Sequence, residues 1–261
     1  MIHFLLTKGD LTWQYERAIK SAEVHGEQIA LWYDEPFQGA WRASNAYMFP
    51  LKVPSWLKEK GYHPSYTYDY LSLKLLLENG GMALGLDTIS VKPAMDLLGE
   101  YELCVSCDVP FEDYVLQTRP IKHPFSMHMI AQKDSDVVAE LLEECEKRLR
   151  SGRVTWEDGT TKDLEWGDSG PGLLTEIVLS HPEKATWAPF PALCGWEGSY
   201  IWKYYCGLDE PSEDVRVIHL FSSAYPTLFE GGPRAVEDWV LELPDFAWVL
   251  PNKMPEILRK P

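Results

Sequence analysis

Two different patterns of apolar residues follow one another in the stretch that begins at Pro64. Apolar residues first recur every three or four positions, the spacing of one buried helix face; they are Tyr66, Tyr70, Leu73, Leu76 and Leu77. Proline suits the first turn of a helix, and Gly80 and Gly81 suit its end because glycine accepts left-handed backbone. Residues 82–86 are uncharged and apolar, which is typical of a strand covered on both faces. The pattern predicts a helix over 64–79 and a strand directly after it.

The same patterns, followed along the whole chain, predict strands that alternate with helices. Strands are expected at 2–6, 28–33, 82–86, 88–92, 101–107, 126–132 and about 215–221. Helices are expected at about 11–24, 64–79, 94–98, 134–150, 171–180 and 233–242. Residues 35–63 are expected to be irregular, and 151–168 polar and rich in turns. This alternation predicts an α/β fold with a mainly parallel central sheet and helices on both faces. One domain over residues 1–261 is the simplest interpretation.

Composition and charge exclude several classes of partner. The chain has 40 acidic and 24 basic residues, for a net charge of −16. Such a field repels nucleic acid and anionic membrane surfaces, so we expect no nucleic-acid partner. No apolar run approaches the ~20 residues that span a bilayer, and the first apolar stretch is too short for a signal peptide. We therefore expect no transmembrane segment and a cytoplasmic location.

Asp87 is the first charged residue after the predicted strand at 82–86. In parallel sheets, ligands bind beyond the carboxyl ends of the strands, so a carboxylate at this place can hold a divalent cation against a diphosphate. Aspartate is also a common turn residue, and a simple capping role before Thr88 is an equally open alternative. The local pattern alone does not decide between the cation-binding role and the capping role. The cation-binding role would indicate chemistry on a nucleotide-activated substrate.

The segment from 69 to 87 resembles the donor-binding core of glycosyltransferase family 32 and its relatives. The family pattern is Ser-Asp, two residues and Arg, then a helix, Gly-Gly, and an apolar strand that ends in Asp-x-Asp. Asp69 occupies the first aspartate position, eleven residues before Gly80, and Asp87 occupies the last position of the Asp-x-Asp motif. The resemblance implies a single GT-A type, Rossmann-like domain.

The chain departs from this family pattern at three positions. Tyr68 stands in place of the serine, Ser72 in place of the arginine, and Gly85 in place of the first aspartate of the Asp-x-Asp motif. A metal ligand and a sugar-contacting arginine are thus missing. If the geometry of the slot is preserved, we expect Gly85→Asp to tighten metal binding, because it would return a negative charge beside the cation. The same departures leave open a non-catalytic sugar- or nucleotide-binding relative.

Three further stretches resemble the family in the same order along the chain. Residues 2–6 resemble its opening Ile-His-x-Ile-Trp strand, and residues 167–175 its Thr-Gly-Pro loop, which leads into a helix beside donor and acceptor. Residues 217–225 resemble its late His-Leu-Trp strand, in which the histidine nears the metal. The resemblance covers roughly residues 1–225 in register.

The resemblance implies that the protein transfers a sugar from a UDP- or GDP-sugar to a carbohydrate or other acceptor. The transfer would retain the anomeric configuration and be assisted by Mn²⁺ or Mg²⁺. The resemblance also implies that Asp87 and Asp168 are catalytic and that Asp87 and His219 hold the metal. The implied donor-binding residues are Leu6, Thr7, Asp69, Gly81, Asp87, Ser169 and Gly170. For Asp168 and Ser169 a helix cap is an alternative, and His219 is alternatively a core histidine. Thr7 is alternatively part of an ordinary polar loop, and Asp69 a helix-face carboxylate with a structural partner.

The five cysteines do not form an evident metal or redox site. Cys104 and Cys107 lie on one predicted strand, where their spacing puts them on opposite faces, and no second close pair completes a four-ligand site. We expect ordinary buried or half-buried thiols. A thiol hydrolase that uses Cys194 and His219 has no supporting nucleophile signature. Eleven tryptophans and thirteen tyrosines favour a carbohydrate ligand slightly, because flat rings stack on sugars.

Overall fold

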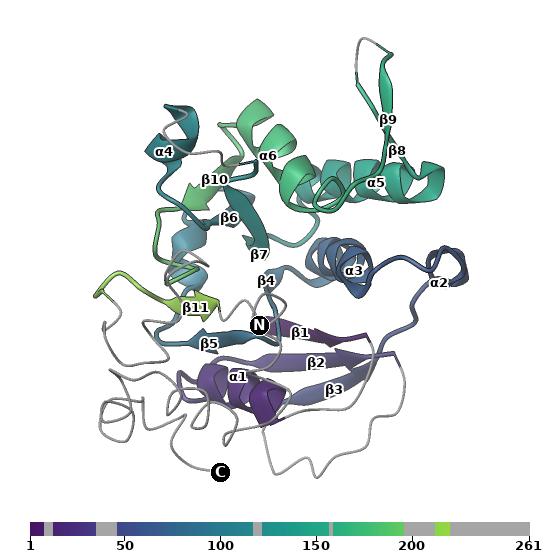
Figure 1. Ribbon diagram of the computed structural model, residues 1–261. Helices are drawn as coiled ribbons and strands as arrows, with labels where there is room; N and C mark the ends of the chain where they lie inside the picture. The colour runs from purple at the N-terminus through teal and green to yellow at the C-terminus, as the bar shows by residue number, and fades with distance from the viewer. Residues whose placement is uncertain (8–12, 35–45, 117–121, 157–158, 196–211, 220–261) are drawn as a thin grey trace, which may run out of the picture.

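A seven-stranded sheet forms the centre of the molecule (Figure 1). The computed structural model describes residues 1–7, 13–34, 46–116, 122–156, 159–195 and 212–219. The strand order is β10-β6-β7-β4-β1-β2-β3, and every pairing is parallel except the two made by β7. The strands are β1 (Ile2–Leu6), β2 (Ile29–Tyr33), β3 (Tyr47–Pro50), β4 (Gly81–Leu84), β6 (Leu103–Cys107), β7 (Phe125–Ala131) and β10 (Ala185–Ala188). The predicted α/β class with a mainly parallel sheet is confirmed.

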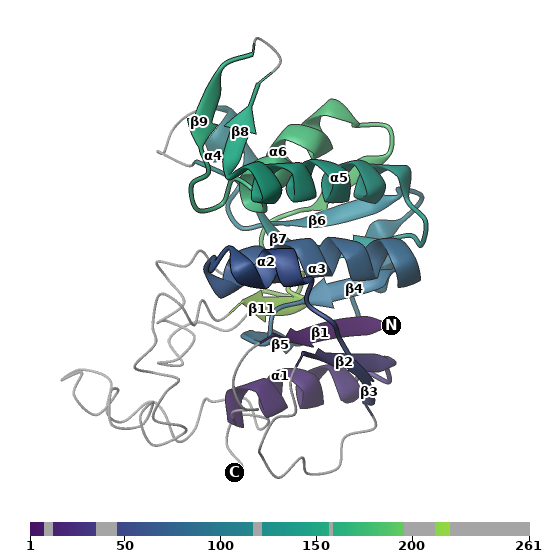
Figure 2. The ribbon, with the colours of Figure 1, turned by 90° about the vertical axis from the view of Figure 1, so that its right-hand side faces the viewer.

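Helices cover both faces of this sheet (Figure 2). One face packs against α3 (Pro64–Asn79), α5 (Asp136–Ser151) and α6 (Pro171–Ser180), in a cluster that includes Leu73, Leu141 and Val178. The other face packs against α1 (Trp13–Glu23) through Ile19 and Ala22. Shorter helices are α2 (Ser55–Glu59), α4 (Phe111–Val115) and the 3₁₀ helix η1 (Met95–Leu98). Among the residues that the structure describes, each helix lacks the length or the apolar character needed to cross a membrane.

Capping hydrogen bonds and terminal glycines explain where the long helices begin and end. Helix α3 spans the predicted residues 64–79; it begins after His63, whose ring accepts a hydrogen bond from Ser65 N, and its last turn is closed by Gly80 N donating to Leu76 O at 2.7 Å. Helix α5 begins after Ser135, whose hydroxyl accepts from Val138 N at 3.2 Å. It ends at Gly152, which has a left-handed φ of 70°. Helix α6 likewise has the predicted bounds.

Two small sheets lie outside the central one. Strand β5 (Thr88–Ser90) leaves the central sheet directly after β4 and pairs antiparallel with β11 (Val217–His219). Strands β8 (Arg153–Thr155) and β9 (Thr161–Asp163) form a hairpin that projects beyond α5 (Figure 1). The pairing of β5 with β11 joins segments far apart in the sequence.

Some short elements were not predicted. The stretch 35–63, expected to be irregular, contains β3 and α2, and 151–168 contains β8 and β9. Helix α4 and strand β10 were also missed. These elements have three to five residues each, too few to show a hydrophobic period. The predicted helix at 233–242 lies outside the described residues, as does the end of the predicted strand at 215–221.

Strand β7 contains an irregularity that shapes the functional edge of the sheet. Val105 of β6 pairs with Met129, but Ser106 pairs with Ser126, so β7 carries two extra residues between these pairs. The extra residues are Met127 and His128. Because β7 runs opposite to its neighbours, its first half meets the carboxyl ends of β4 and β6. A bulge of this kind re-aims side chains next to it.

Candidate functional site

A cleft of about 690 Å³ opens at the edge of the sheet where β1, β4 and β6 end. Ligand sites of α/β folds lie at this edge. Five residues predicted from the sequence line the cleft: Leu6 at the end of β1, Thr7 directly after it, Asp69 on α3, Asp87 after β4, and His219 on β11. The structure therefore brings most of the predicted site into one cavity, from segments more than 200 residues apart.

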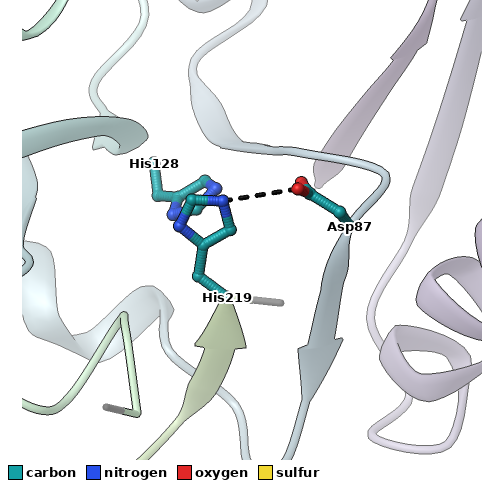
Figure 3. A group of neighbouring side chains, drawn as sticks. All are labelled: Asp87, His128 and His219. Atoms are coloured by element: carbon teal, nitrogen blue, oxygen red, sulfur yellow. Dashed lines mark ion pairs between the residues drawn. The ribbon is translucent and has the colours of Figure 1, made fainter. Parts of the chain in front are cut away.

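Asp87, His128 and His219 form a compact group of metal-ligand side chains in this cleft (Figure 3). Their ligand atoms all lie within 4.8 Å of one another. His219 Nε2 is 3.5 Å from Asp87 Oδ2, and the His128 and His219 rings meet edge to face with centroids 4.5 Å apart. Two imidazoles and one carboxylate at this separation fit the ligand sphere of a divalent metal.

The backbone explains why Asp87 and His219 meet. The turn after β4 is closed by Thr88 Oγ1, which donates to Gly85 O at 2.7 Å, so Asp87 is held just before β5. In the antiparallel pair of β5 and β11, His219 lies opposite Thr88. The register thus sets His219 beside Asp87, as the family resemblance predicted.

His128 is the member of this group that the sequence did not reveal. It lies in the bulge of β7, is only 4% exposed, and has its Nδ1 3.4 Å from Ser126 Oγ. A Cβ atom at Gly85 would lie 3.3 Å from His128 Nε2 and 2.6 Å from Asp87 Oδ1. The imidazole therefore occupies space next to the position of the missing aspartate. This reverses the expectation for Gly85→Asp, since a side chain there would crowd the two ligands.

The electrostatics of the group favour the neutral, metal-binding form at His128 and the protonated form at His219, whose proton a bound cation would displace. Burial and the neighbouring His219 lower the pKa of His128 to about 3, although Asp87 acts in the opposite direction. Burial would also lower the pKa of His219, but the charge and hydrogen bond of Asp87 raise it above the ordinary value. His128 is therefore neutral near pH 7, the form in which imidazole binds a metal. The group fits a divalent cation in both its spacing and its donor atoms.

Asp69, Ser169 and Gly170 also come together, although they are separated by about 100 residues in the sequence. Ser169 Oγ donates to Asp69 Oδ2 at 3.1 Å. A Cβ at Gly170 would lie 2.5 Å from the same oxygen, so a side chain at position 170 would force this carboxyl to move. Burial raises the pKa of Asp69 to about 7, and the Ser169 hydrogen bond opposes the rise. The three predicted donor-binding residues thus form one contact group, with Asp69 lining the cleft.

Asp168 has a different position from the one expected of a catalytic group. Its carboxylate accepts from Glu165 N at 2.8 Å and lies 2.9 Å from Lys162 Nζ. Burial favours the protonated form, but these hydrogen bonds and the Lys162 charge hold its pKa below the ordinary value. Its neighbours Gly167 and Pro171 line the cleft, whereas Asp168 itself anchors the turn before α6. Its catalytic role stays a prediction.

Gly81, predicted to bind the donor, lies at the opposite end of β4 from Asp87. Its φ is 97°, and a Cβ there would collide with Met1 O and lie 3.1 Å from His3 Nε2. His3 Nε2 in turn contacts Gly80 O at 2.8 Å. Packing against the start of β1 therefore accounts for this glycine.

Asp108 is a further cleft residue that the sequence analysis did not single out. It follows β6, and Ser106 Oγ donates to its Oδ1 at 3.0 Å. Burial raises its pKa, while His219 and three hydrogen bonds act against the rise. Asp108 is the first charge after a buried strand, the signal that identified Asp87, so the same criterion could have found it.

The four cysteines that the structure describes, Cys104, Cys107, Cys145 and Cys194, are buried free thiols, while Cys206 lies outside the described residues. Cys104 packs in the cluster beside α1 and Cys107 in the cluster beside α3, so they lie on opposite faces of the sheet. Burial raises the pKa of each thiol to about 12. Neither is a thiolate near pH 7, which excludes nucleophilic use of this pair.

No protein-family model matches the chain, and no curated protein matches its sequence. Similar solved structures include PaToxG glycosyltransferase, with a TM-score of 0.46 and 15% identity over 69% of this chain and 67% of that one. They also include the glycosyltransferase GlyE of Streptococcus pneumoniae TIGR4, with a TM-score of 0.45 and 14% identity over 86% of this chain and 55% of that one. The apo form of GlyE has a TM-score of 0.40 and 13% identity over 85% of this chain and 54% of that one. The chain spans about half the length of GlyE.

Proposed function

We propose that this protein is a glycosyltransferase that moves a sugar from a nucleotide diphosphate-sugar to a carbohydrate acceptor with the help of a divalent metal. The observation that carries the proposal is the group of Asp87, His128 and His219 in a cleft at the carboxyl edge of a mainly parallel sheet. Nucleotides bind at this edge of α/β folds. Because the chain has a net charge of −16, a cation is needed to offset the repulsion of a diphosphate.

Mn²⁺ suits this ligand set better than Mg²⁺. Mg²⁺ prefers oxygen ligands and keeps much of its water, whereas imidazole nitrogen suits transition metals. When bound, the cation would neutralise charge on the departing diphosphate. Asp87 and the two imidazoles would hold it at the cleft, just beyond the end of β4. Neutral His128 replaces the carboxylate that Gly85 lacks.

The remaining cleft residues bind and orient the substrate. Leu6, the last residue of β1, and Thr7, the next residue, receive the nucleoside, since they line the cleft at the carboxyl end of that strand. Asp69 binds hydroxyls of the transferred sugar, and Ser169 and Gly170 hold its carboxyl in place. We propose retention of anomeric configuration, which proton NMR of the product tests directly.

Thermal unfolding with a panel of UDP- and GDP-sugars, with and without Mn²⁺, tests the proposal. A donor that binds only the folded protein raises Tm by mass action, and we expect this rise to require Mn²⁺. Asp87→Asn should lose the metal-dependent rise. Asp163→Asn is the matched control, because this carboxylate is on the β8–β9 hairpin and 90% exposed. A panel in which no nucleotide sugar raises Tm in the wild-type protein would refute the proposal.

A non-catalytic nucleotide-sugar-binding protein is the second candidate. It is favoured by Ser72, which is fully buried on α3 at the position where the related enzymes have an arginine. Release of nucleoside diphosphate from the donor separates the two candidates. Metal-dependent binding with turnover supports the enzyme, and the same binding without turnover for any acceptor supports the binding protein.

A further inference from the structure

Trp166 is a large apolar side chain that the fold leaves exposed at the cleft. It is 66% exposed and lines the same cavity as Asp69 and Asp87. Lys122 and His123 line this part of the cleft with it. An indole ring exposed beside a cavity forms a flat apolar surface with a polar N–H, which suits one face of a sugar ring.

We propose that Trp166, with Lys122 and His123, forms the acceptor subsite, in which a neutral pyranose ring of the acceptor stacks on the indole. This inference rests on the proposed function and names its acceptor class. The acceptor lies over the turn before α6, and its reactive hydroxyl faces the donor sugar near Asp69. The subsite is separate from the candidate metal ligands, which lie after β4, on β7 and on β11.

The backbone on both sides of Trp166 is fixed. Glu165 N donates to the Asp168 carboxylate at 2.8 Å, and Asp168 N donates to Glu165 O at 3.1 Å. Arg148 Nη1 donates to Asp168 O at 2.8 Å, and Gly172 N donates to Gly167 O at 2.7 Å. An exposed tryptophan on so well anchored a turn is preorganised for a ligand, because little entropy is lost when it binds.

His123 gives a second, independent indication of a ligand here. Its ring is held against the turn, since a Cβ at Gly167 would lie 3.4 Å from Cδ2 and a Cβ at Gly172 only 2.9 Å from Cε1. Its buried Nε2 has no hydrogen-bond partner among the residues that the structure describes. An unpaired buried polar atom costs free energy. Because this atom is buried, the ring would have to turn toward the cleft for a hydroxyl of a bound acceptor to pair with it.

Contacts connect this subsite to the donor region. Asp69 touches Ser169 and Gly170, which belong to the same turn as Trp166. Tyr68, next to Asp69 and also lining the cleft, lies near enough to both Asp69 and Asp87 for their charges to raise its pKa, after the larger effect of burial. The cleft is therefore continuous from the metal ligands, past Asp69, to Trp166.

The charges around Trp166 favour a neutral sugar over a charged peptide. Lys122 Nζ lies 3.2 Å from Glu165 Oε2, and Lys162 Nζ lies 3.4 Å from the same atom and 2.9 Å from Asp168 Oδ2. Two lysines and two carboxylates thus compensate one another. A charged acceptor would have to break these pairs, whereas an uncharged ring would not.

Saturation-transfer NMR with a panel of methyl hexopyranosides tests the subsite without requiring turnover. At least one glycoside should receive saturation on its ring C–H protons in the wild-type protein. Trp166→Ala should weaken this binding about tenfold, and Trp166→Phe should retain much of it because a ring remains. Trp156→Ala is the matched control: Trp156 is 43% exposed on the hairpin and does not line the cleft. Loss of binding in Trp156→Ala, no effect of Trp166→Ala, or no binding by any glycoside would overturn the inference.

Donor binding, measured by thermal unfolding on the same variants, separates this inference from the proposed function. Trp166→Ala should leave the Mn²⁺-dependent rise in Tm by the donor unchanged. If the donor has no effect on the wild-type protein while glycosides bind through Trp166, the proposed function fails and the subsite stands. If the donor binds but glycoside binding does not depend on Trp166, only the proposed acceptor subsite is refuted.

Discussion

At the scale of single residues, Gly85 decides which side chains complete the metal-binding group. His128 Nε2 and Asp87 Oδ1 both lie close to where a Cβ at 85 would stand. Gly85→Asp should therefore displace the ligands and weaken Mn²⁺ binding about tenfold or more, the size seen when the support of a ligand is disturbed. Calorimetric titration of Mn²⁺ in the presence of nucleoside diphosphate measures this. Gly85→Ala should act in the same direction, and tighter binding by Gly85→Asp would show that His128 is not a ligand.

Asp69 should make stability depend on pH. Burial raises its pKa from 3.8 to about 7, so between these values the folded protein binds a proton that the unfolded chain releases. The contribution of the Asp69 carboxyl to the free energy of unfolding is therefore fully present below pH 4 and is lost as the pH rises toward 7. From pH 5 to pH 8, the free energy of unfolding should fall by about 1–3 kcal/mol more in the wild-type protein than in Asp69→Asn.

Urea unfolding at several pH values measures this difference. Tyr66, Tyr68 and Cys145 keep their protons in this range, because burial raises the pKa of each and nearby Asp69 adds to the rise. The exposed Asp163 gives the control, since Asp163→Asn should follow the wild-type profile. Parallel profiles for Asp69→Asn and the wild-type protein would mean that Asp69 is ionised throughout.

The sequence predicted some site residues and not others for physical reasons. Asp87 follows a buried strand, and its place at the sheet edge depends only on local pattern and strand direction. His128 lies inside a strand of ordinary apolar type, and only the reversed direction and bulge of β7 bring it to Asp87. Asp168 has the right sequence position for a site residue, but Lys162 and Glu165 N engage its carboxylate.

At the scale of elements, Arg148 joins α5 to the turn before α6. Its guanidinium is 4% exposed and donates to Asp168 O at 2.8 Å, to Glu144 at 3.0 Å and to Glu176 at 3.3 Å. Arg148→Met should lower the free energy of unfolding by about 2–3 kcal/mol, less than for a fully buried pair because Glu176 is half exposed.

Urea unfolding of Arg148→Met beside Arg153→Met gives the comparison. Arg153 is 60% exposed and 3.6 Å from Asp163, so its replacement should cost no more than about 0.5 kcal/mol. Equal losses in the two variants would show that Arg148 does not anchor the turn.

Elements were predictable where their own residues determine them. Helix α3 has a proline start, an apolar stripe and a glycine end, and its observed bounds agree with the prediction. Strand β3 is exposed at the edge of the sheet, and β5 pairs with β11 from more than 120 residues away. Such pairings are set by tertiary contacts, which no local pattern contains.

At the scale of the whole molecule, the acidic charge should govern how fast the donor arrives. A net charge of −16 repels an anionic nucleotide sugar over distances that salt shortens. With Mn²⁺ saturating, the association rate constant should rise a few-fold between about 10 and 150 mM NaCl. Stopped-flow fluorescence measures this rate. A steep fall with salt would instead indicate that local positive charge at the donor site outweighs the net charge of the chain.

Anomalous scattering at the manganese edge, from crystals grown with Mn²⁺ and a nucleoside diphosphate, tests the central claim most directly. We predict one strong peak in the cleft, within about 2.3 Å of an oxygen of Asp87 and a nitrogen each of His128 and His219, with a diphosphate oxygen beside it. The peak should vanish in Asp87→Asn. A manganese peak elsewhere, or a nucleotide bound in the cleft with no metal at these three residues, would contradict the proposed metal-assisted transfer.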